Sequence, residues 1–259
     1  MIIKGQSLIY KQEAIIIRTV DYSDTSQIFT LLTPNYGKIG LLAKGLKQPN
    51  NIYQSAMQTL SCINIVYDKK NTAQLATFRE CSLCHIFLGL RNNLQCIYAA
   101  LYCAELIREY ATENEANPQI YKLLRYSLYK LSSQTSPRNV VLYFSWYLLY
   151  LEGFLPSFYQ CMHCGQSILP NQKYIFLSND GGICCNNCKS KDIKNYTIIS
   201  SNALFQLQEI LKGNQEVNMD TIQLTTSEFQ ELISCFILYI QNMLEKKISL
   251  FRYIQKLVD

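Results

Sequence analysis

The sequence predicts an α+β protein in which a small closed β-barrel precedes a helical domain that carries an inserted four-cysteine module. Three observations support this fold class. Stretches rich in β-branched and aromatic residues fill the first 80 residues, apolar residues recur at helical spacing from about residue 81, and two Cys-x-x-Cys pairs interrupt the helical pattern. The expected domains are residues 1–80 for the barrel, 81–157 for the first helical part, 158–192 for the cysteine module and 193–259 for the rest of the helical domain.

Strands are expected in the barrel at residues 13–18, 27–33, 38–44, 59–67 and 73–78. They are rich in Ile, Leu, Val, Thr, Tyr and Phe, which favour the pleated surface of a sheet. Pro34 and Gly37 predict a hairpin turn between the second and third strands, because proline presets one turn dihedral and glycine tolerates a positive φ. This many strands in about seventy residues suits a closed barrel, since closure leaves no exposed sheet edge.

Helical periodicity predicts helices at about residues 94–107, 121–131, 137–151, 204–211 and 229–244. Pro137 begins the third of them, and Gly153 and Pro156 end it. Thr226, Ser227 and Glu228 are the expected N-terminal cap of the last helix.

Two cysteine pairs give the strongest local signal. Two residues separate Cys161 from Cys164 and Cys185 from Cys188, and 20 residues lie between the pairs. Two intervening residues let both sulfurs of a pair converge on one ion, and four thiolates satisfy the tetrahedral preference of zinc. The pattern therefore predicts one structural zinc ion with a closed coordination shell, which leaves no open position for a catalytic water.

Two alternatives to this ligand set stay open. Cys184 could pair with Cys188 in place of Cys185, although the two-residue spacing favours Cys185. His163 could ligate only if its neighbouring cysteines turned away. The cysteines outside the module fall in apolar segments and are expected to be buried as small hydrophobic side chains. These are Cys62, Cys81, Cys84, Cys96, Cys103 and Cys235.

The sequence does not suggest an enzyme. Its 2 histidines, His85 and His163, provide little material for acid–base catalysis, and neither a phosphate-binding glycine loop nor a nucleobase-deaminase pattern occurs. The longest apolar stretches, residues 140–151 and 232–240, are too short to span a bilayer, and the N-terminus lacks the features of a secretion signal. We therefore expect a non-catalytic, cytoplasmic protein with no membrane partner.

Positive charge is concentrated in the barrel. Residues 1–80 hold 9 Lys and Arg residues against 5 Asp and Glu residues, whereas the rest of the chain holds 15 against 14. Scattered surface lysines explain this excess as well as a polyanion-binding module does.

Two groups of motifs cover about half of the chain. The first comprises Glu-Ala-Ile-Ile-Ile-Arg at residues 13–18, Thr-Pro-Asn-Tyr-Gly-Lys at residues 33–38 and Ala-Lys-Gly at residues 43–45. The second begins with Leu-Glu-Gly-Phe-Leu-Pro at residues 151–156 and leads into the two cysteine pairs, with a Gly-Gly pair between them. In these motifs and their order, the chain resembles the bacterial RecO family of recombination mediators.

The resemblance implies an OB-fold for residues 1–80 and a zinc-binding module inserted in the helical domain. It also implies a DNA repair protein that binds single- and double-stranded DNA, anneals complementary strands and helps load RecA. The implied partners are RecR, the C-terminal tail of single-stranded DNA-binding protein and, indirectly, the RecA filament, in the bacterial cytoplasm and at the nucleoid during repair. The chain departs from the family after Gly45, where Lys47 is the single lysine in a segment that is usually more basic.

Barrels of this type bind nucleic acid through a positive groove and aromatic platforms. The candidate phosphate contacts are Arg18, Lys38, Lys44 and Lys47, which flank the predicted strands, and the candidate stacking residue is Tyr36 at the hairpin tip. An alternative hypothesis is a zinc-ribbon adaptor that binds other proteins and never contacts DNA. A third is a metal hydrolase.

Overall fold

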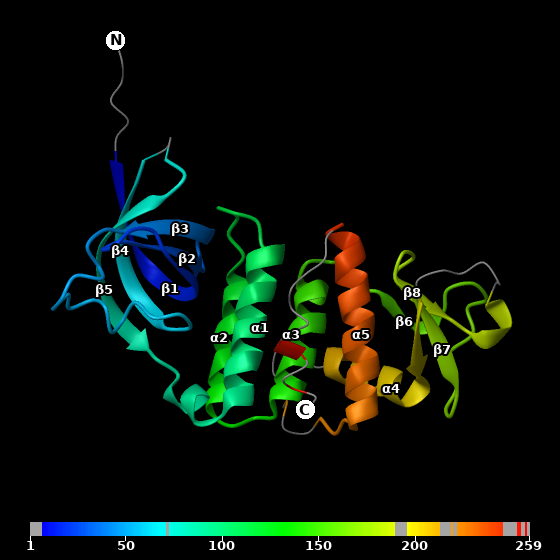
Figure 1. The fold of residues 1–259 in the computed structure, drawn as a ribbon. Coiled ribbons are helices and arrows are strands. Elements are labelled where there is room, and N and C mark those ends of the chain that lie inside the picture. Colours follow the sequence, from blue (N-terminus) through cyan, green and yellow to red (C-terminus); the bar gives the residue numbers. More distant parts are fainter. Residues whose placement is uncertain are drawn as a thin grey trace, which may run out of the picture. The chain divides into compact units, whose positions relative to one another are not determined.

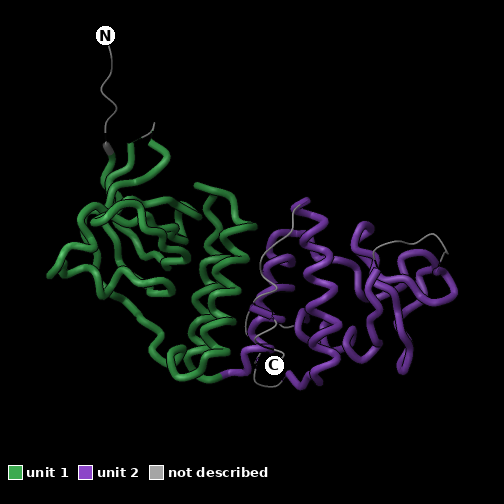
Figure 2. Tube along the Cα trace, in the orientation of Figure 1, with its two compact units in different colours: residues 1–134 green, residues 135–259 purple. Residues whose placement is uncertain are grey.

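The computed structural model describes residues 7–70, 73–189, 196–212, 219, 222–245, 253, 254 and 257. The chain divides into two compact units, Met1–Gln134 and Thr135–Asp259, which Figure 2 shows in different colours.

The first unit begins with a closed β-barrel (Figure 1). Its strands are β1 (Ser7–Asp21), β2 (Gln27–Thr33), β3 (Gly37–Ala43), β4 (Cys62–Lys70) and β5 (Ala76–His85). Their order around the barrel is β1-β2-β3-β5-β4, and a short parallel pairing of β3 with β5 closes it. The predicted closed barrel is confirmed.

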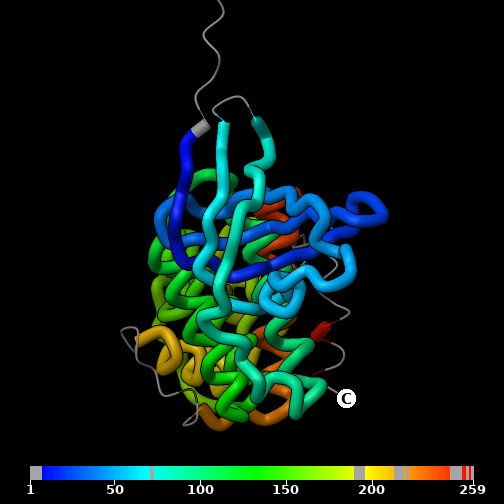
Figure 3. Tube along the Cα trace, turned by 90° about the vertical axis from the view of Figure 1, so that its left-hand side faces the viewer, coloured from blue at the N-terminus to red at the C-terminus, as the bar shows by residue number. Residues whose placement is uncertain are grey.

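Strand β1 is long because it pairs with two neighbours in turn. Residues 7–15 pair antiparallel with β4, and residues 15–21 pair antiparallel with β2 (Figure 3). The second register shifts between Ile16 and Arg18, which indicates a β-bulge where the strand bends. The sequence predicts only residues 13–18 for this strand, because the preceding residues mix polar and apolar side chains. In the structure, hydrogen bonding to β4 extends the strand back to Ser7.

The barrel core is built from alternate side chains of the strands, as expected where one face of a sheet is buried. In β3, Ile39, Leu41 and Ala43 are buried and the residues between them are partly exposed. They belong to one apolar cluster with Phe29 of β2 and Ile63 of β4. This packing fixes the register of the hairpin that β2 and β3 form.

The helical part of the first unit consists of η1 (Leu88–Asn92), α1 (Leu94–Tyr110) and α2 (Pro118–Ser132). The side chains of Asn93 and Asn117 cap the two longer helices by accepting hydrogen bonds from backbone N–H groups of the first turn. The connection between α1 and α2 lies against β3, where the Asn114 N–H donates a 3.0 Å hydrogen bond to the Lys38 carbonyl.

Gly37 permits this close approach. A Cβ atom there would lie 1.9 Å from the backbone oxygen of Glu115, and the residue also has a φ of +60°. Only glycine satisfies both conditions without strain. The α1–α2 connection is therefore fixed over the tip of the β2–β3 hairpin.

The second unit contains α3 (Pro137–Leu151), α4 (Ser201–Lys212) and α5 (Thr226–Met243), which pack on one another, and α4 and α5 contact a short sheet. The sheet has the order β6-β8-β7-β9, from strands β6 (Ser157–Cys161), β7 (Lys173–Leu177), β8 (Gly182–Cys184) and β9 (Tyr196–Ser200). Trp146 of α3 is buried between the rings of Phe158 and Phe236, at centroid distances of 5.0 and 5.4 Å. These aromatic contacts join α3, β6 and α5.

Two element boundaries, the end of β5 and the cap of α5, differ from the sequence-based expectation. β5 continues past residue 80 to His85, because it pairs with β4 as far as Cys62. β9 joins the sheet of the cysteine module by pairing with β7, and the expected boundary at residues 192 and 193 lies outside the described residues. The cap of α5 is Thr225, one residue before the expected cap, and it forms a capping box with Glu228.

Within the described ranges, no helix has both the length and the apolar character needed to cross a membrane.

Candidate metal centre and nucleic-acid interface

The two cysteine pairs meet at one end of the sheet in the second unit. Cys161 is the last residue of β6 and Cys185 directly follows β8, and these strands pair with each other. Cys164 lies in the tight turn after β6, in which the Gly165 N–H donates to the Cys161 carbonyl over 2.8 Å. Cys188 ends the short 3-10 helix η2 (Asn186–Cys188). Strand pairing thus joins two segments that are far apart in the sequence.

The four sulfur atoms have the spacing of a tetrahedral metal site. The Sγ atoms of Cys161, Cys164, Cys185 and Cys188 all lie within 4.8 Å of one another. The Cys164 and Cys185 Sγ atoms are 3.9 Å apart. A tetrahedral zinc ion with Zn–S bonds of about 2.3 Å requires an S···S distance of about 3.8 Å. The donor set therefore fits a metal ion held by four thiolates.

The geometry separates Cys185 from its neighbour. Cys184 is buried in β8, its thiol donates to the backbone oxygen of Cys185 over 3.3 Å, and it is not among the four clustered ligand atoms. Successive side chains of a strand point to opposite faces, so only one of two adjacent cysteines can face the cluster. His163 is exposed and is not part of the group of ligand atoms. Both alternatives to the predicted ligand set are disfavoured.

The cluster also lowers the proton affinity of one sulfur. Burial raises the pKa of Cys161, but backbone N–H groups of Cys185, Cys164 and His163 outweigh it and lower the pKa to about 6. Burial and the charge on Cys161 raise the pKa of Cys184 to about 11. A thiolate is the metal-binding form of cysteine, so the N–H groups that stabilise the Cys161 thiolate favour ligation by this sulfur.

The cysteines outside the module do not all follow the expectation of burial. Cys62, Cys96, Cys103 and Cys235 are buried, whereas Cys81 is partly buried against the barrel core and Cys84 is exposed.

A second group of possible ligand atoms comes from Glu13, Cys62 and Cys84, which also lie within 4.8 Å of one another. The Glu13 carboxylate already accepts hydrogen bonds from the Tyr121 hydroxyl at 2.5 Å and from Arg125 at 2.9 Å. This group therefore has a structural explanation, since it attaches α2 to β1.

The structure does not bring the predicted nucleic-acid contacts together in one place. Gln27 pairs with Ala43 at one end of the β2–β3 hairpin, and Thr33 pairs with Gly37 at the other. Lys44 and Lys47 follow the first end, whereas Tyr36 and Lys38 belong to the second. Arg18 lies on β1 opposite the middle of β2.

The cationic side chains of this set differ in their surroundings. Arg18 and Lys44 are exposed. Lys47 forms a 3.0 Å ion pair with Asp21 and donates its backbone N–H to Thr25. Lys38 donates from its ammonium group to the backbone oxygen of Arg108 over 2.8 Å. Arg18 and Lys44 are thus the most accessible of the candidate phosphate contacts.

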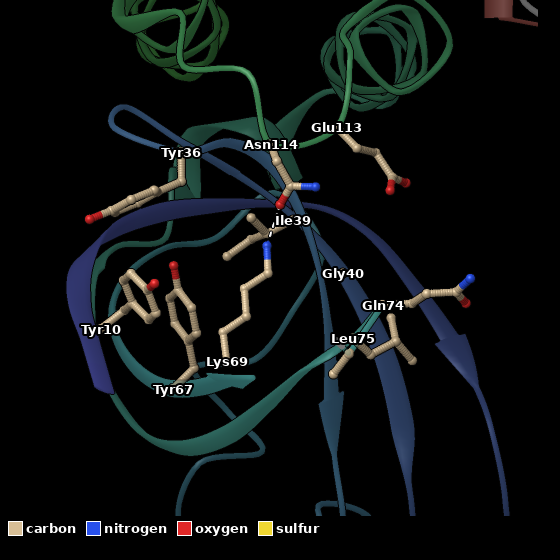
Figure 4. Close-up of a pocket in the computed structure, with 11 residues that line it drawn as sticks. Tyr10, Tyr36, Ile39, Gly40, Tyr67, Lys69, Gln74, Leu75, Glu113 and Asn114 are labelled. Atoms are coloured by element: carbon tan, nitrogen blue, oxygen red, sulfur yellow. Dashed lines mark hydrogen bonds between the residues drawn. The ribbon is translucent and has the colours of Figure 1, made fainter. Parts of the chain in front are cut away.

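Tyr36 lies at the edge of a cavity of about 780 Å³ in the first unit (Figure 4). Its ring is edge-on to that of Tyr10, at 5.1 Å, and Tyr10 stacks on Tyr67 at 5.2 Å. The side chain of Lys69 extends across the cavity and donates a hydrogen bond to the Asn114 amide oxygen. The lining residues are Tyr10, Tyr36, Ile39, Gly40, Tyr67, Lys69, Ala73, Gln74, Leu75, Glu113 and Asn114.

Sequence reasoning identified Tyr36 and missed the rest of this tyrosine pocket. Tyr10 and Tyr67 are direct partners in the β1–β4 ladder. Tyr10 precedes the residues predicted for the first strand, so its partner was not recognised. Lys69 contributed to the count of basic residues, but nothing in the local sequence indicates that it faces Asn114.

Comparison with known proteins agrees with this architecture. Residues 7–87 match the family model described as Recombination protein O N terminal, and residues 91–250 match Recombination protein O C terminal. The chain is 25% identical to DNA repair protein RecO of Syntrophus aciditrophicus over 252 residues, covering 96% of this chain and 97% of the relative. It is 30% identical to DNA repair protein RecO of Bacillus subtilis over 185 residues, covering 71% of each protein. These matches, over both the barrel and the helical domain with its cysteine cluster, show that the chain belongs to the RecO family.

Proposed function

We propose that this protein is a non-catalytic mediator of DNA repair and homologous recombination, which binds single- and double-stranded DNA and anneals complementary strands. Membership of the RecO family, established over both parts of the chain, is the observation that carries the proposal. The closed barrel with exposed cationic residues supports it, because small barrels of this kind bind single strands along a positive groove.

Annealing requires no covalent chemistry. It requires a surface that holds two polyanions close together and reduces their mutual repulsion. The exposed side chains of Arg18 and Lys44 are suited to neutralise phosphates. Lys47 would have to exchange its partner Asp21 for a phosphate group. Each contact releases counterions, so binding should weaken as the salt concentration rises.

The metal in this proposal is one structural zinc ion, held by Cys161, Cys164, Cys185 and Cys188. It would join β6, the end of β8 and η2, and sites of this kind contribute roughly 10–16 kcal/mol of apparent binding energy to the folded state. With four thiolates in the shell, its role is to hold the fold of the module.

The proposed partners follow from the family resemblance. They are RecR, the C-terminal tail of single-stranded DNA-binding protein and, through these, the RecA filament that the protein helps to load. The proposed place of action is the bacterial cytoplasm, at the nucleoid during repair.

A strand-annealing assay with complementary oligonucleotides tests the proposal. The test variant carries Arg18→Glu and Lys44→Glu on the barrel. The matched control carries Lys122→Glu on α2 and Lys173→Glu on β7, both exposed, so its net charge is the same. We expect the test variant to anneal more slowly than the control, and the salt dependence of its binding to single-stranded DNA to be shallower by about 1.4 log units per log unit of salt.

Two results would contradict the proposal. If both variants and the unmodified protein anneal DNA at the same rate, Arg18 and Lys44 do not take part in annealing. Failure of the unmodified protein to bind or anneal DNA would instead favour the alternative, a zinc-ribbon adaptor that acts only through other proteins.

A further inference from the structure

We propose that the tyrosine pocket of the first unit receives one unstacked nucleobase of a bound single strand of DNA. The proposal rests on the proposed function, since it concerns how the barrel holds a strand. It adds a base-binding site to the phosphate contacts.

The aromatic wall of the pocket is held in place before any ligand arrives. Tyr67 is 1% exposed, stacks on Tyr10 and accepts a 2.7 Å hydrogen bond from the Gln12 amide. Tyr36 is 44% exposed and stands edge-on to Tyr10 at the rim. A wall whose side chains are already ordered costs little conformational entropy on binding. The exposed ring of Tyr36 is the surface on which a base can stack.

Hydrogen-bonding groups lie beside the aromatic wall. The Tyr67 hydroxyl accepts from Gln12, so its own proton is available to a ligand acceptor. Burial raises the pKa of Tyr67 to about 12, which keeps that proton in place at neutral pH. Among the described residues, the side-chain NH2 groups of Gln74 and Asn114 have no hydrogen-bond partner. Hydroxyl and amide groups can pair with the polar edge of any base.

The charge of the lining favours a neutral occupant. Lys69 and Glu113 are the charged residues among those that line the cavity, and their charges offset each other. A phosphate or an acidic peptide would gain little from this balance, whereas an uncharged aromatic ring can stack on the exposed ring of Tyr36. The volume of about 780 Å³ falls within the range of about 300–1,000 Å³ that is common for small-molecule sites.

The position of the pocket suits a single strand of DNA that lies along the β2–β3 hairpin. Lys44 follows one end of the hairpin, and Tyr36 lies at the other. The β-strands β2 and β3 have 7 residues each, so the hairpin is roughly 23 Å long at about 3.3 Å per residue. Barrels of this type bind about 4–16 nucleotides, so one DNA segment can reach both ends. Phosphates would then contact the Lys44 end while a base enters the pocket.

Binding of the unmodified protein to two labelled chains tests this directly. One is an oligothymidylate of about 15 nucleotides, and the other is an abasic phosphodiester chain of the same length. Base stacking on an aromatic side chain predicts at least about fivefold tighter binding to the oligothymidylate. This comparison needs no substitution, so a folding defect cannot affect it.

Three variants assign the preference to the pocket. Tyr36→Ala should weaken oligothymidylate binding about fivefold and leave abasic-chain binding unchanged, and Tyr36→Phe, which keeps the ring, should resemble the unmodified protein. Tyr129→Ala is the matched control, because Tyr129 is an exposed tyrosine on α2 of the same unit. Thermal unfolding of each variant checks that the barrel is intact.

Each outcome has a distinct meaning. Equal binding of both chains, or no effect of Tyr36→Ala, overturns the base pocket and leaves DNA binding in place. Absence of binding to either chain overturns the proposed function itself. A third arm adds free thymidine monophosphate as competitor. If it displaces the oligothymidylate as effectively as unlabelled oligothymidylate does, the pocket binds free nucleotides. The proposal that it binds a base of a DNA strand is then wrong.

Discussion

The ammonium group of Lys38 on β3 donates a 2.8 Å hydrogen bond to the backbone oxygen of Arg108 in the last turn of α1. Carbonyl oxygens at a helix C-terminus lack partners within the helix and carry partial negative charge. A lysine that binds one of them stabilises the helix end. Here the same contact attaches α1 to the barrel.

This contact predicts that Lys38 acts mainly in folding. Lys38→Met should lower the free energy of unfolding by about 1–2 kcal/mol, because a charged hydrogen bond to the helix end is lost. Lys44→Met, at an exposed lysine next to the same strand, should change it by less than about 0.5 kcal/mol. Urea denaturation measures both, and equal stabilities would show that the contact contributes nothing.

Adjacent cysteines provide a test of the metal site. Cys185→Ser should reduce bound zinc to well below one ion per chain, because it removes one of the four clustered sulfurs. Cys184→Ser should keep one zinc ion, since that thiol is not one of the four clustered sulfurs. Zinc content per chain after purification distinguishes them. Loss of zinc in the Cys184 variant alone would reverse the assignment.

Because Asp21 forms an ion pair with Lys47, we expect the pKa of Asp21 to change when DNA binds. Hydrogen bonds from Gln27 and Lys47 lower the pKa of Asp21 below its usual 3.8. A carboxyl whose folded-state pKa is depressed stabilises the fold above 3.8, and this contribution disappears as the pH falls through the folded-state value. If Lys47 leaves its ion pair with Asp21 to bind a DNA phosphate, the pKa of Asp21 should rise when single-stranded DNA is added.

An NMR titration of the Asp21 carboxyl measures this change. The Lys47→Met variant serves as control, because its Asp21 should start with a higher pKa and respond less to DNA. A pKa that is the same with and without DNA in the unmodified protein would show that Lys47 keeps its partner in the complex.

Two consecutive residues of β6 should differ sharply in their effect on stability. Phe158 is buried against Trp146, whereas Tyr159 is 51% exposed. Phe158→Ala should cost about 3–5 kcal/mol, through lost burial and the cavity left behind. Tyr159→Ala should cost less than about 0.5 kcal/mol. Trp146 is the only tryptophan of the chain, so its fluorescence during unfolding reports on this unit. Similar costs would contradict the packing around it.

The features that the sequence predicted well are those that depend on local pattern. The apolar composition of residues 38–44 predicted a strand there, and β3 (Gly37–Ala43) confirms it. The two-residue spacing favoured Cys185 over Cys184, and the structure places the Cys185 sulfur, not that of Cys184, in the group of four ligand atoms.

The features that escaped prediction depend on contacts between distant residues. Tyr10, Tyr36 and Tyr67 come together only because β1 pairs with β4 and the β2–β3 hairpin folds over them. Lys38 looked like a surface lysine beside a turn, and the end of α1 gives it a structural partner. No local periodicity encodes either contact.

If the barrel binds DNA by neutralising phosphates, its affinity for single-stranded DNA must depend on salt concentration. For the unmodified protein, the logarithm of the binding constant should fall linearly with the logarithm of salt concentration between about 50 and 200 mM, with a slope of at least about 1.4 if two phosphates are neutralised. A binding constant that stays the same over this range would contradict the account.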